Sequence, residues 1–369
     1  MRRFLCGGLL LLIAAFAQAP LTREQAYRRA KDLSELGRAM FFDPALSASG
    51  KMSCSTCHDP RYAYGPAPGR AIALRAAPSL KYLQTSPAFT EHYFDSETTG
   101  DDSIDNGPTG GLTWDGRVDR GRDQARLPLL SKEEMGNQSV ESLVERARGA
   151  KFGGRLAELA GRGATVDAMY RVILEALEAF QQDYREFYPY SSKYDAYLAG
   201  KAVLSAREGR GLELFVAQDK GDCARCHIAT RGVSGTPPQF TDYGLIAIGV
   251  PRNPEIRANR DPRFYDLGLC GPVRTDFEGR EEYCGRFLTP TLRNVALRQE
   301  FFHNGAVKTL REAVAFYVDR DSKPIEADLP ARYRANVETG APFGGTPQLN
   351  ATEIDDIVEF LRTLTDGTQ

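Results

Sequence analysis

One five-residue pattern constrains this chain more than any other feature, because it occurs twice. Residues 54–58 and residues 223–227 both read C-x-x-C-H, the attachment signature of c-type haem. The two thiols add to the vinyl groups of the porphyrin, and the imidazole lies beneath the iron as its proximal ligand. Structural zinc would need both C-x-x-C pairs in one site, whereas these pairs are far apart in the chain. We predict two covalently bound haems c, attached at Cys54, Cys57 and His58, and at Cys223, Cys226 and His227.

Helical patterns surround both motifs. A similar stretch containing glycine and phenylalanine precedes each of them, at residues 36–42 and 209–215. Farther along, apolar residues spaced by three and four predict amphipathic helices over residues 169–180 and 354–364. No segment alternates apolar and polar residues, so strands should be few. The fold class is therefore mainly α, with two cytochrome c-like helical haem domains, long loops and few strands.

The domain limits follow from these repeats. We place the first domain at residues 20–200 and the second at residues 201–369, joined near Gly200. Ser205 and Glu208 have the spacing of a capping box at the start of the second unit. Asn350 or Thr352 is expected to cap its last helix.

The first residues have the parts of an export signal. Arg2 and Arg3 are basic, and the apolar stretch that follows is too short to span a membrane. We assign residues 1–19 to a signal peptide, with cleavage expected after Ala17; an uncleaved anchor is the alternative. The mature protein is then periplasmic and has no later membrane span. Cys270 and Cys284 bracket a loop in this oxidising compartment, which predicts a disulfide between them.

Charge excludes one class of partner. The chain has 47 Lys and Arg against 49 Asp and Glu, so it lacks the basic excess of a general nucleic-acid binder. Residues 82–116 contain seven acids and no Lys or Arg. A solvated loop is the simplest interpretation, and a calcium site or a docking surface for a basic partner are the alternatives.

The sixth ligand of the second haem is constrained because the second domain contains no methionine. Haems that only carry electrons often use His and Met as axial ligands. The last Met is Met169, so the second domain contains none. Its iron must use another residue, such as His303 or a tyrosinate, or stay open. A tyrosinate is a hard anionic ligand, which points away from simple electron transfer.

Further motifs connect the chain with a known family. They are W-D-G-R at 114–117, then Gln124, Pro128 and Glu134-Met135-Gly136, T-P-T-L-R-N-V-A at 289–296 and F-H-N-G at 302–305. In this order, and with both haem motifs, the chain resembles the bacterial di-haem cytochrome c peroxidase family, including its MauG branch. The resemblance covers essentially the whole mature chain.

The resemblance implies a division of labour. The haem on His58 would react with hydrogen peroxide, and the haem on His227 would store or relay oxidising equivalents. Trp114 would lie between the haems. Gln124 and Glu134 match the distal-pocket pair, with Pro128 shaping the loop. A carboxylate suits that place because cleaving a bound peroxide requires a proton to move between its two oxygens.

The resemblance also assigns Tyr317. Its place after the F-H-N-G motif holds a Met in the peroxidase branch and a Tyr in MauG, so Tyr317 would be the sixth ligand of the second haem. His303 is better interpreted as a structural, hydrogen-bonded residue of its turn.

Some features depart from the family. No His follows the first motif within residues 59–91, which suggests an open first haem; His92 could ligate it at rest, or be a surface or core His. The Asn of the calcium motif R-N-x-P is replaced by Ala76, which puts calcium in doubt. MauG has a Trp two residues before the second haem Cys, and here that residue is Gly221, so the MauG substrate does not carry over.

The functional prediction is an exported di-haem c-type peroxidase of MauG-like type. It would reduce peroxide at the first haem and pass oxidising equivalents through Trp114 and the second haem to a protein reductant or protein substrate. One alternative is a conventional cytochrome c peroxidase that takes electrons from a small cytochrome c or cupredoxin. A second is a non-enzymatic di-haem electron carrier, which would not explain an acid-plus-amide distal pair.

Overall fold

A computed structural model of the chain describes residues 21–69, 73–94, 104–232, 235–320, 327–338 and 348–368. The predicted signal peptide, residues 1–19, lies outside these ranges. Helices dominate the described part, where the one sheet is a two-stranded ribbon. This confirms the mainly α fold class. Among the helices so described, none is both long and apolar enough to cross a membrane.

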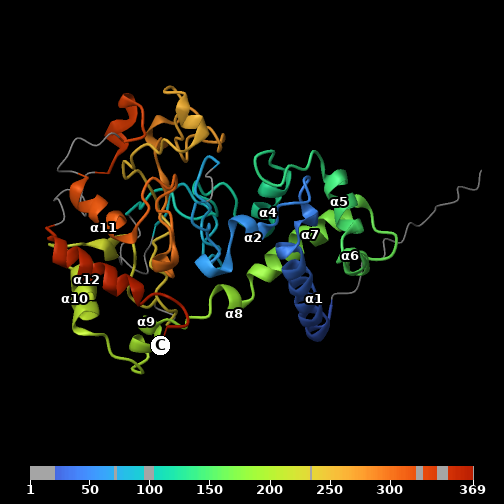
Figure 1. Cartoon of the computed structure of the whole chain (residues 1–369), viewed down its shortest axis with the longest axis horizontal. Helices are drawn as coiled ribbons and strands as arrows, with labels where there is room; N and C mark the ends of the chain where they lie inside the picture. The colour runs from blue at the N-terminus through green and yellow to red at the C-terminus, as the bar shows by residue number, and fades with distance from the viewer. Residues whose placement is uncertain are drawn as a thin grey trace, which may run out of the picture.

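Figure 1 shows two lobes, one around α1 and α7 and the other around α10 and α12. The helices are α1 (Arg23–Phe42), α2 (Cys54–Cys57), α4 (Gly121–Leu130), α5 (Val140–Gly149), α6 (Gly153–Ala160), α7 (Val166–Gln181), α8 (Tyr184–Phe187), α9 (Lys193–Leu198), α10 (Ala206–Val216), α11 (Leu310–Asp319) and α12 (Ala351–Arg362). The strands β1 (Leu245–Ile246) and β2 (Phe287–Leu288) pair antiparallel, with Leu245 opposite Leu288.

The first lobe is organised by the crossing of α1 and α7. A Cβ atom at Gly37 would lie 1.8 Å from the carbonyl oxygen of Ala176, so the close approach of the two helices requires glycine there. Next to the crossing, the rings of Phe41 and Phe180 pack edge to face with centroids 5.4 Å apart. The apolar stripe predicted over residues 169–180 is the face of α7 that lines this core.

The second lobe repeats the same crossing with α10 and α12. A Cβ atom at Gly211 would lie 2.0 Å from the carbonyl oxygen of Asp356. The rings of Phe215 and Phe360 pack beside it, with centroids 5.2 Å apart. The two lobes therefore share one packing solution, in which a helix before the haem motif crosses a later amphipathic helix at a glycine.

The predicted helix starts in the second lobe are confirmed. Ser205 and Glu208 form the capping box of α10. Asn350, rather than Thr352, caps α12, because its side chain accepts hydrogen bonds from the backbone N–H groups of Thr352 and Glu353. These caps satisfy N–H groups that have no partner inside the helix.

Contacts between residues run across the predicted domain limit at residue 200. Tyr194 on α9 belongs to the second core, where its ring lies 5.4 Å from that of Phe360. Residues 73–94 and 104–119 also pack against the second lobe: the Leu245 N–H donates to the Pro108 carbonyl at 2.8 Å. Part of the first half of the sequence thus forms part of the second lobe.

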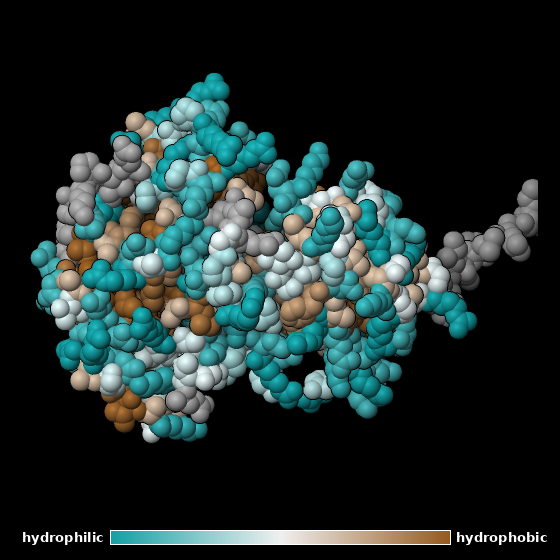
Figure 2. Space-filling view, in the orientation of Figure 1, coloured by the Kyte–Doolittle hydropathy of each residue, from teal (hydrophilic) through white to brown (hydrophobic). Residues whose placement is uncertain are grey.

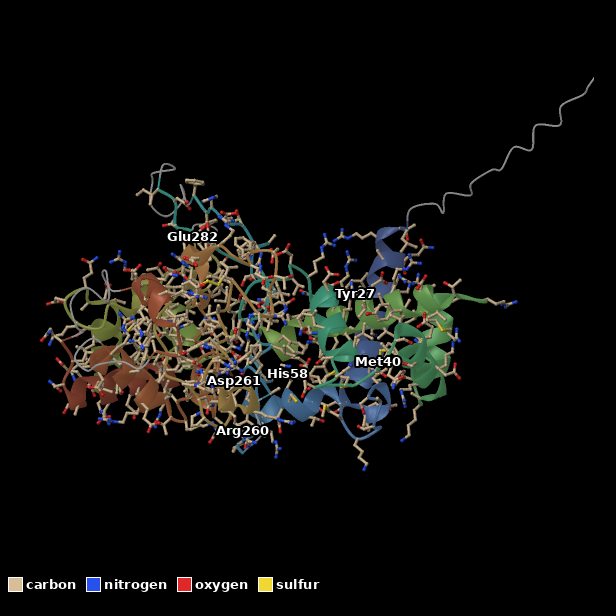
Figure 3. The ribbon with its side chains drawn as sticks, turned by 90° about the horizontal axis from the view of Figure 1, so that it is seen from above. Tyr27, Met40, His58, Arg260, Asp261 and Glu282 are labelled. Carbon is tan, nitrogen blue, oxygen red and sulfur yellow. A yellow bond between two sulfur atoms is a disulfide. The ribbon has the colours of Figure 1, made fainter. Side chains whose placement is uncertain are left out.

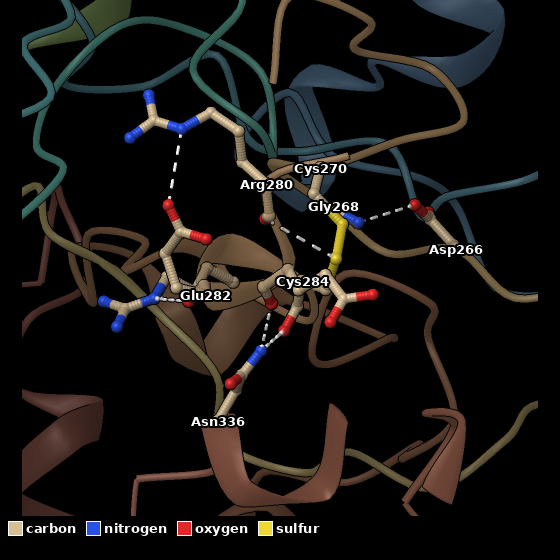
Figure 4. The surroundings of a disulfide bond; sticks show 9 residues. Asp266, Gly268, Cys270, Arg280, Glu282, Cys284 and Asn336 are labelled. Carbon is tan, nitrogen blue, oxygen red and sulfur yellow. Dashed lines mark hydrogen bonds and ion pairs between the residues drawn. A yellow bond between two sulfur atoms is a disulfide. The ribbon is translucent and has the colours of Figure 1, made fainter. Parts of the chain in front are cut away.

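The long loops of the second lobe have a small core of their own. Cys270 and Cys284 are disulfide-bonded in the structure and are both buried (Figure 4). Around them pack Leu245, Leu269, Phe277, Tyr283, Leu329 and Tyr333. The amide of Asn336 donates to the carbonyl of Cys284 at 3.1 Å, which ties the following segment to the same cluster.

Candidate haem-binding sites

The two predicted proximal histidines have the same hydrogen-bonding arrangement. His58 follows α2 directly, and its Nδ1 lies 2.8 Å from the backbone carbonyl oxygen of Tyr64. The Nδ1 of His227 lies 2.9 Å from the carbonyl oxygen of Phe240. Because a carbonyl can only accept, Nδ1 carries the proton in both rings and Nε2 keeps a lone pair for a metal.

Burial keeps both imidazoles neutral. It lowers the pKa of His58, although the nearby Tyr64 and Pro78 carbonyls oppose the shift. It lowers the pKa of His227 to about 4. Neutral imidazole is the form that ligates iron, so both rings are ready for that role over the physiological range. Figure 3 shows His58 toward the junction of the two lobes.

The four motif cysteines are thiols, in contrast to the disulfide pair. Cys54, Cys57, Cys223 and Cys226 are all half-buried and free. Burial raises the pKa of Cys54 to about 12, and the nearby Cys57 and Glu134 add to the shift. The four motif thiols are therefore available for thioether attachment to a haem, each pair beside its own histidine.

A large apolar cavity opens around the second motif. The residues of its wall that matter for a haem are Trp114, Cys223, Cys226, His227, Arg298 and Tyr317. Aliphatic and aromatic side chains of β1, β2, α11 and α12 complete the lining. Figure 2 shows apolar side chains gathered on this face of the second lobe. An apolar slot with two thiols and an imidazole at one wall matches the shape and chemistry of a haem c.

Arg298 provides an independent test of that fit. Its guanidinium donates to two backbone carbonyls, those of Ala77 at 3.4 Å and Glu300 at 3.2 Å. The Glu300 carboxylate contacts Lys308 instead, at 3.3 Å, and within the described ranges Arg298 has no ion pair. Desolvation lowers the pKa of Arg298 to about 10, although the Glu300 charge opposes the shift. A haem propionate would add a negative charge that stabilises this desolvated guanidinium, so the residues present fit the group.

Tyr317 lies on α11 and lines the same cavity as His227. Burial raises the pKa of its phenol, and the thiols of Cys226 and Cys223 add to the shift. Its ring packs against Phe316 with centroids 5.3 Å apart. The structure therefore brings together the second motif and the oxygen donor that the sequence predicted for it.

His303 lies at the edge of the cavity as a stacked ring. It is 3.5 Å from the Phe287 ring, centroid to centroid, and nearly parallel to it. Burial lowers the pKa of His303 to about 3. Its backbone carbonyl accepts from the Ala76 N–H at 2.8 Å.

Trp114 joins the second cavity to the loop that follows the first motif. Its indole N–H donates to the Ala76 carbonyl at 2.7 Å, and its ring is buried against the cavity. Two residues after Ala76, the Pro78 carbonyl lies close enough to the imidazole of His58 to oppose the lowering of its pKa. The segment 76–78 therefore lies beside His58 and contacts Trp114 and Arg298.

The predicted distal residues lie on α4 and the turn after it. Gln124 lines a polar cavity with Gln84 and Glu178. Pro128 is inside α4, and its carbonyl accepts from the Met135 N–H at 3.1 Å, which folds the Glu134 turn back onto the helix. Glu134 itself is accessible from the surface; desolvation raises the pKa of its carboxyl.

Two candidate features lie apart from these sites. His92 is a surface residue: its side chain is 57% exposed and its Nδ1 is 2.6 Å from the Asp105 carboxylate. The acidic segment around it falls partly outside the described residues. Arg75, the first residue of the altered calcium motif, forms ion pairs of 2.6 Å with both Asp115 and Asp266. Within the described ranges, no cluster of three acidic, His or Cys residues could hold a metal ion.

Sequence reasoning missed Arg298 and the partner groups of the histidines. The carbonyls of Tyr64 and Phe240 carry no side-chain signature. Arg298 lies between the motifs at 289–296 and 302–305, and the desolvation of its charge becomes evident only when its surroundings are known.

Comparison with known proteins identifies relatives over nearly the whole chain. Residues 31–203 match the family described as di-haem cytochrome c peroxidase. The methylamine utilization protein MauG of Paracoccus denitrificans is 32% identical, over 96% of this chain and 94% of its own. Cytochrome c551 peroxidase of Nitrosomonas europaea is 26% identical, over 90% and 80%. The crystal structure of the diheme peroxidase BthA from Burkholderia thailandensis superposes with a TM-score of 0.79 at 37% identity, covering 91% of this chain and 86% of that one.

Proposed function

This chain belongs to the di-haem cytochrome c peroxidase family, in its MauG-like branch, and we propose from that premise how its residues divide the work. Hydrogen peroxide is reduced at the site of His58. Oxidising equivalents pass by way of Trp114 to the site of His227, and from there to a protein. The covalent attachment of both haems c through the four motif cysteines is part of this proposal.

The observation that carries the proposal is the contact made by Trp114. Its indole lines the cavity of the second motif and donates to Ala76, in the loop whose Pro78 carbonyl lies beside the imidazole of His58. An indole is large and oxidisable, and this one is buried away from water. It connects the two sites through protein groups rather than solvent.

A haem held at His58 would supply the iron that reacts with peroxide. Side chains of the first lobe transfer the protons that peroxide cleavage requires. Desolvation raises the pKa of Glu134, which suits a group that must both accept and return a proton. Gln124, on the preceding helix, offers an amide that can hydrogen-bond an oxygen of the substrate.

Tyr317 is proposed as the sixth ligand at the second site. The support is its position in the cavity of His227 and the lack of any Met after Met169. An anionic oxygen ligand stabilises oxidised iron, which suits a site that stores oxidising equivalents. Tyr317→Phe should open the site or admit water and so change the low-spin spectrum, whereas Tyr317→His should restore a low-spin, six-coordinate haem. An unchanged Tyr317→Phe spectrum would assign the ligand elsewhere, with His303 next.

The mature protein is proposed to be periplasmic. Its partner is proposed to be a small cytochrome c, a cupredoxin or a protein whose side chain is modified. The replacement of the Trp before the second motif by Gly221 argues for a partner other than that of MauG. Calcium is not required by the proposal, because Arg75 already supplies a buried positive charge between Asp115 and Asp266.

The test is the absorption and electron paramagnetic resonance spectrum of the resting protein, followed by one equivalent of peroxide. We expect one high-spin and one low-spin haem, and a rapid spectral change at both. Trp114→Phe should keep both haems and slow the change at the second. Two low-spin haems with no response to peroxide would mean an electron carrier instead.

A further inference from the structure

The two residues whose carbonyls hold the proximal histidines differ by one hydroxyl group. Tyr64 and Phe240 are both buried, and both have a left-handed backbone, with φ of 57° and 54°. Each packs into an aromatic cluster beside the helix crossing of its lobe. The second lobe shows that phenylalanine satisfies the fold at this place, so the phenol of Tyr64 is not needed for it.

That phenol has a base as its partner. The Tyr64 hydroxyl donates to Glu186 Oε2 at 2.8 Å, and Glu186 Oε1 lies 2.5 Å from the Arg38 guanidinium. The Glu186 side chain is 33% exposed and that of Arg38 is 54% exposed, whereas Tyr64 as a whole is 2% exposed. A buried phenol is thus connected to solvent through one carboxylate.

This arrangement matters because a phenol gives up an electron readily only when its proton can leave. The backbone carbonyl of Tyr64 is hydrogen-bonded to Nδ1 of His58, so this residue is directly connected to the first haem site. We propose that Tyr64 is a redox-active residue of the first lobe, which exchanges single electrons between that site and the surface at Glu186 and Arg38. The inference rests on the proposed reduction of peroxide at His58.

Peroxide reduction removes two electrons from the protein. Tyr64 supplies one electron to the first site, its O–H bond breaks, and the proton moves to the Glu186 carboxylate. The products are a neutral tyrosyl radical and a protonated Glu186, with Arg38 unchanged. An electron from the reductant and the same proton restore Tyr64.

Tyr82 provides a matched control. It is also buried and has φ of 61°, and its hydroxyl donates to the Asp366 carboxylate at 2.7 Å. However, the guanidinium carbon of Arg293 lies 4.7 Å from the centre of its ring, and a cation there opposes the loss of an electron. No contact of Tyr82 involves either proximal histidine. The same hydrogen-bonding motif therefore occurs once near the first site and once away from it.

The experiment uses the full di-haem protein, mixed with one equivalent of peroxide without reductant and frozen at intervals for electron paramagnetic resonance. We expect a tyrosyl radical in the wild type and in Tyr82→Phe, and at least a tenfold weaker signal in Tyr64→Phe. Glu186→Gln should retain Tyr64 but also weaken the signal, because the proton acceptor is lost. Optical spectra of the same samples report the reaction of peroxide at the haems.

The outcomes separate the inference from its premise. A normal optical response with no radical in the wild type would overturn the role of Tyr64 and leave the proposed function intact. A signal of wild-type size in Tyr64→Phe, or equal losses in both Tyr→Phe variants, would also overturn it. If the haem spectrum does not respond to peroxide, the proposed function fails and the inference falls with it.

Discussion

In each lobe a glycine lets the helix before the haem motif touch the backbone of a later helix, and a buried carbonyl orients the histidine of the motif. Gly37 and Gly211 have this role, and Tyr64 and Phe240 supply the carbonyls. The frame that holds the proximal side is therefore duplicated almost residue for residue.

The remaining surroundings are not duplicated. The second motif opens into an apolar cavity that contains Tyr317, whereas Gln124 of the first lobe lines a polar cavity and Glu134 lies in a turn nearby. The comparison indicates that different residues determine how each haem is attached and how it would react. The repeated frame fixes the imidazole, and the lobe-specific side chains determine what the metal would meet on its other face.

The largest expected effect is the loss of a whole cofactor from one lobe. Cys54→Ala with Cys57→Ala should leave one covalent haem per chain and abolish the fast reaction with peroxide. Cys223→Ala with Cys226→Ala should also leave one haem but keep an initial reaction at the first site. Haem counts after acid-acetone extraction check both variants. Two extraction-resistant haems in either variant would contradict the assignment.

The second largest effect is expected on the rate of peroxide cleavage when the Glu134 carboxylate of the first lobe is removed. Glu134→Gln should bind both haems and slow peroxide cleavage by roughly 10²–10⁴, the usual range for lost acid–base assistance. In the wild type, the rate should fall as the pH decreases through the raised pKa of Glu134, because the required carboxylate becomes protonated. Stopped-flow traces over a pH series measure both effects. The acid limb should be absent in the variant.

Breaking the disulfide should weaken the second lobe selectively. Cys270 and Cys284 are 14 residues apart, and closing a loop of that size contributes about 3 kcal/mol by chain entropy. Replacing both by Ser should lower the free energy of unfolding by that order. Hydrogen exchange should increase in the loop core around Phe277 and Leu329, with the first lobe unchanged. Equal changes in both lobes would mean that their stabilities are coupled.

The helix crossings should respond alike if the frames are equivalent. Gly37→Ala and Gly211→Ala each place a methyl group against a backbone carbonyl, which should cost about 1–3 kcal/mol. Gly154, inside α6, has open space around its Cβ position, so Gly154→Ala should not destabilise the protein. Denaturant unfolding of the three variants gives the comparison. A large effect at one crossing and none at the other would show that only one lobe depends on close helix contact.

Much of the frame could be predicted from the sequence because it is periodic or local. The stripe of α7, the capping box at Ser205 and the cap at Asn350 each depend on residues a few positions apart. Both haem motifs are also local. Such features are encoded within one or two helical turns, where spacing alone determines which groups meet.

The contacts between loops could not be predicted in the same way. Trp114 with Ala76 and Arg298 with Ala77 join segments that have no regular period, and one partner in each pair is a backbone carbonyl. The limit expected at residue 200 likewise depended on local signals, whereas Tyr194 belongs to the second core through contacts with distant helices. The residues of the candidate site could be identified individually, and their arrangement required the fold.

The packing of residues 104–119 against the second lobe has a consequence for modularity. The cofactor pocket of the C-terminal half takes one wall, Trp114, from the N-terminal half. A gene fragment encoding only the second half would produce a pocket open on that side, and the other fragment would expose an indole that is normally covered. Although each lobe repeats the frame of the other, we expect a complete pocket only when both halves of the chain are expressed together.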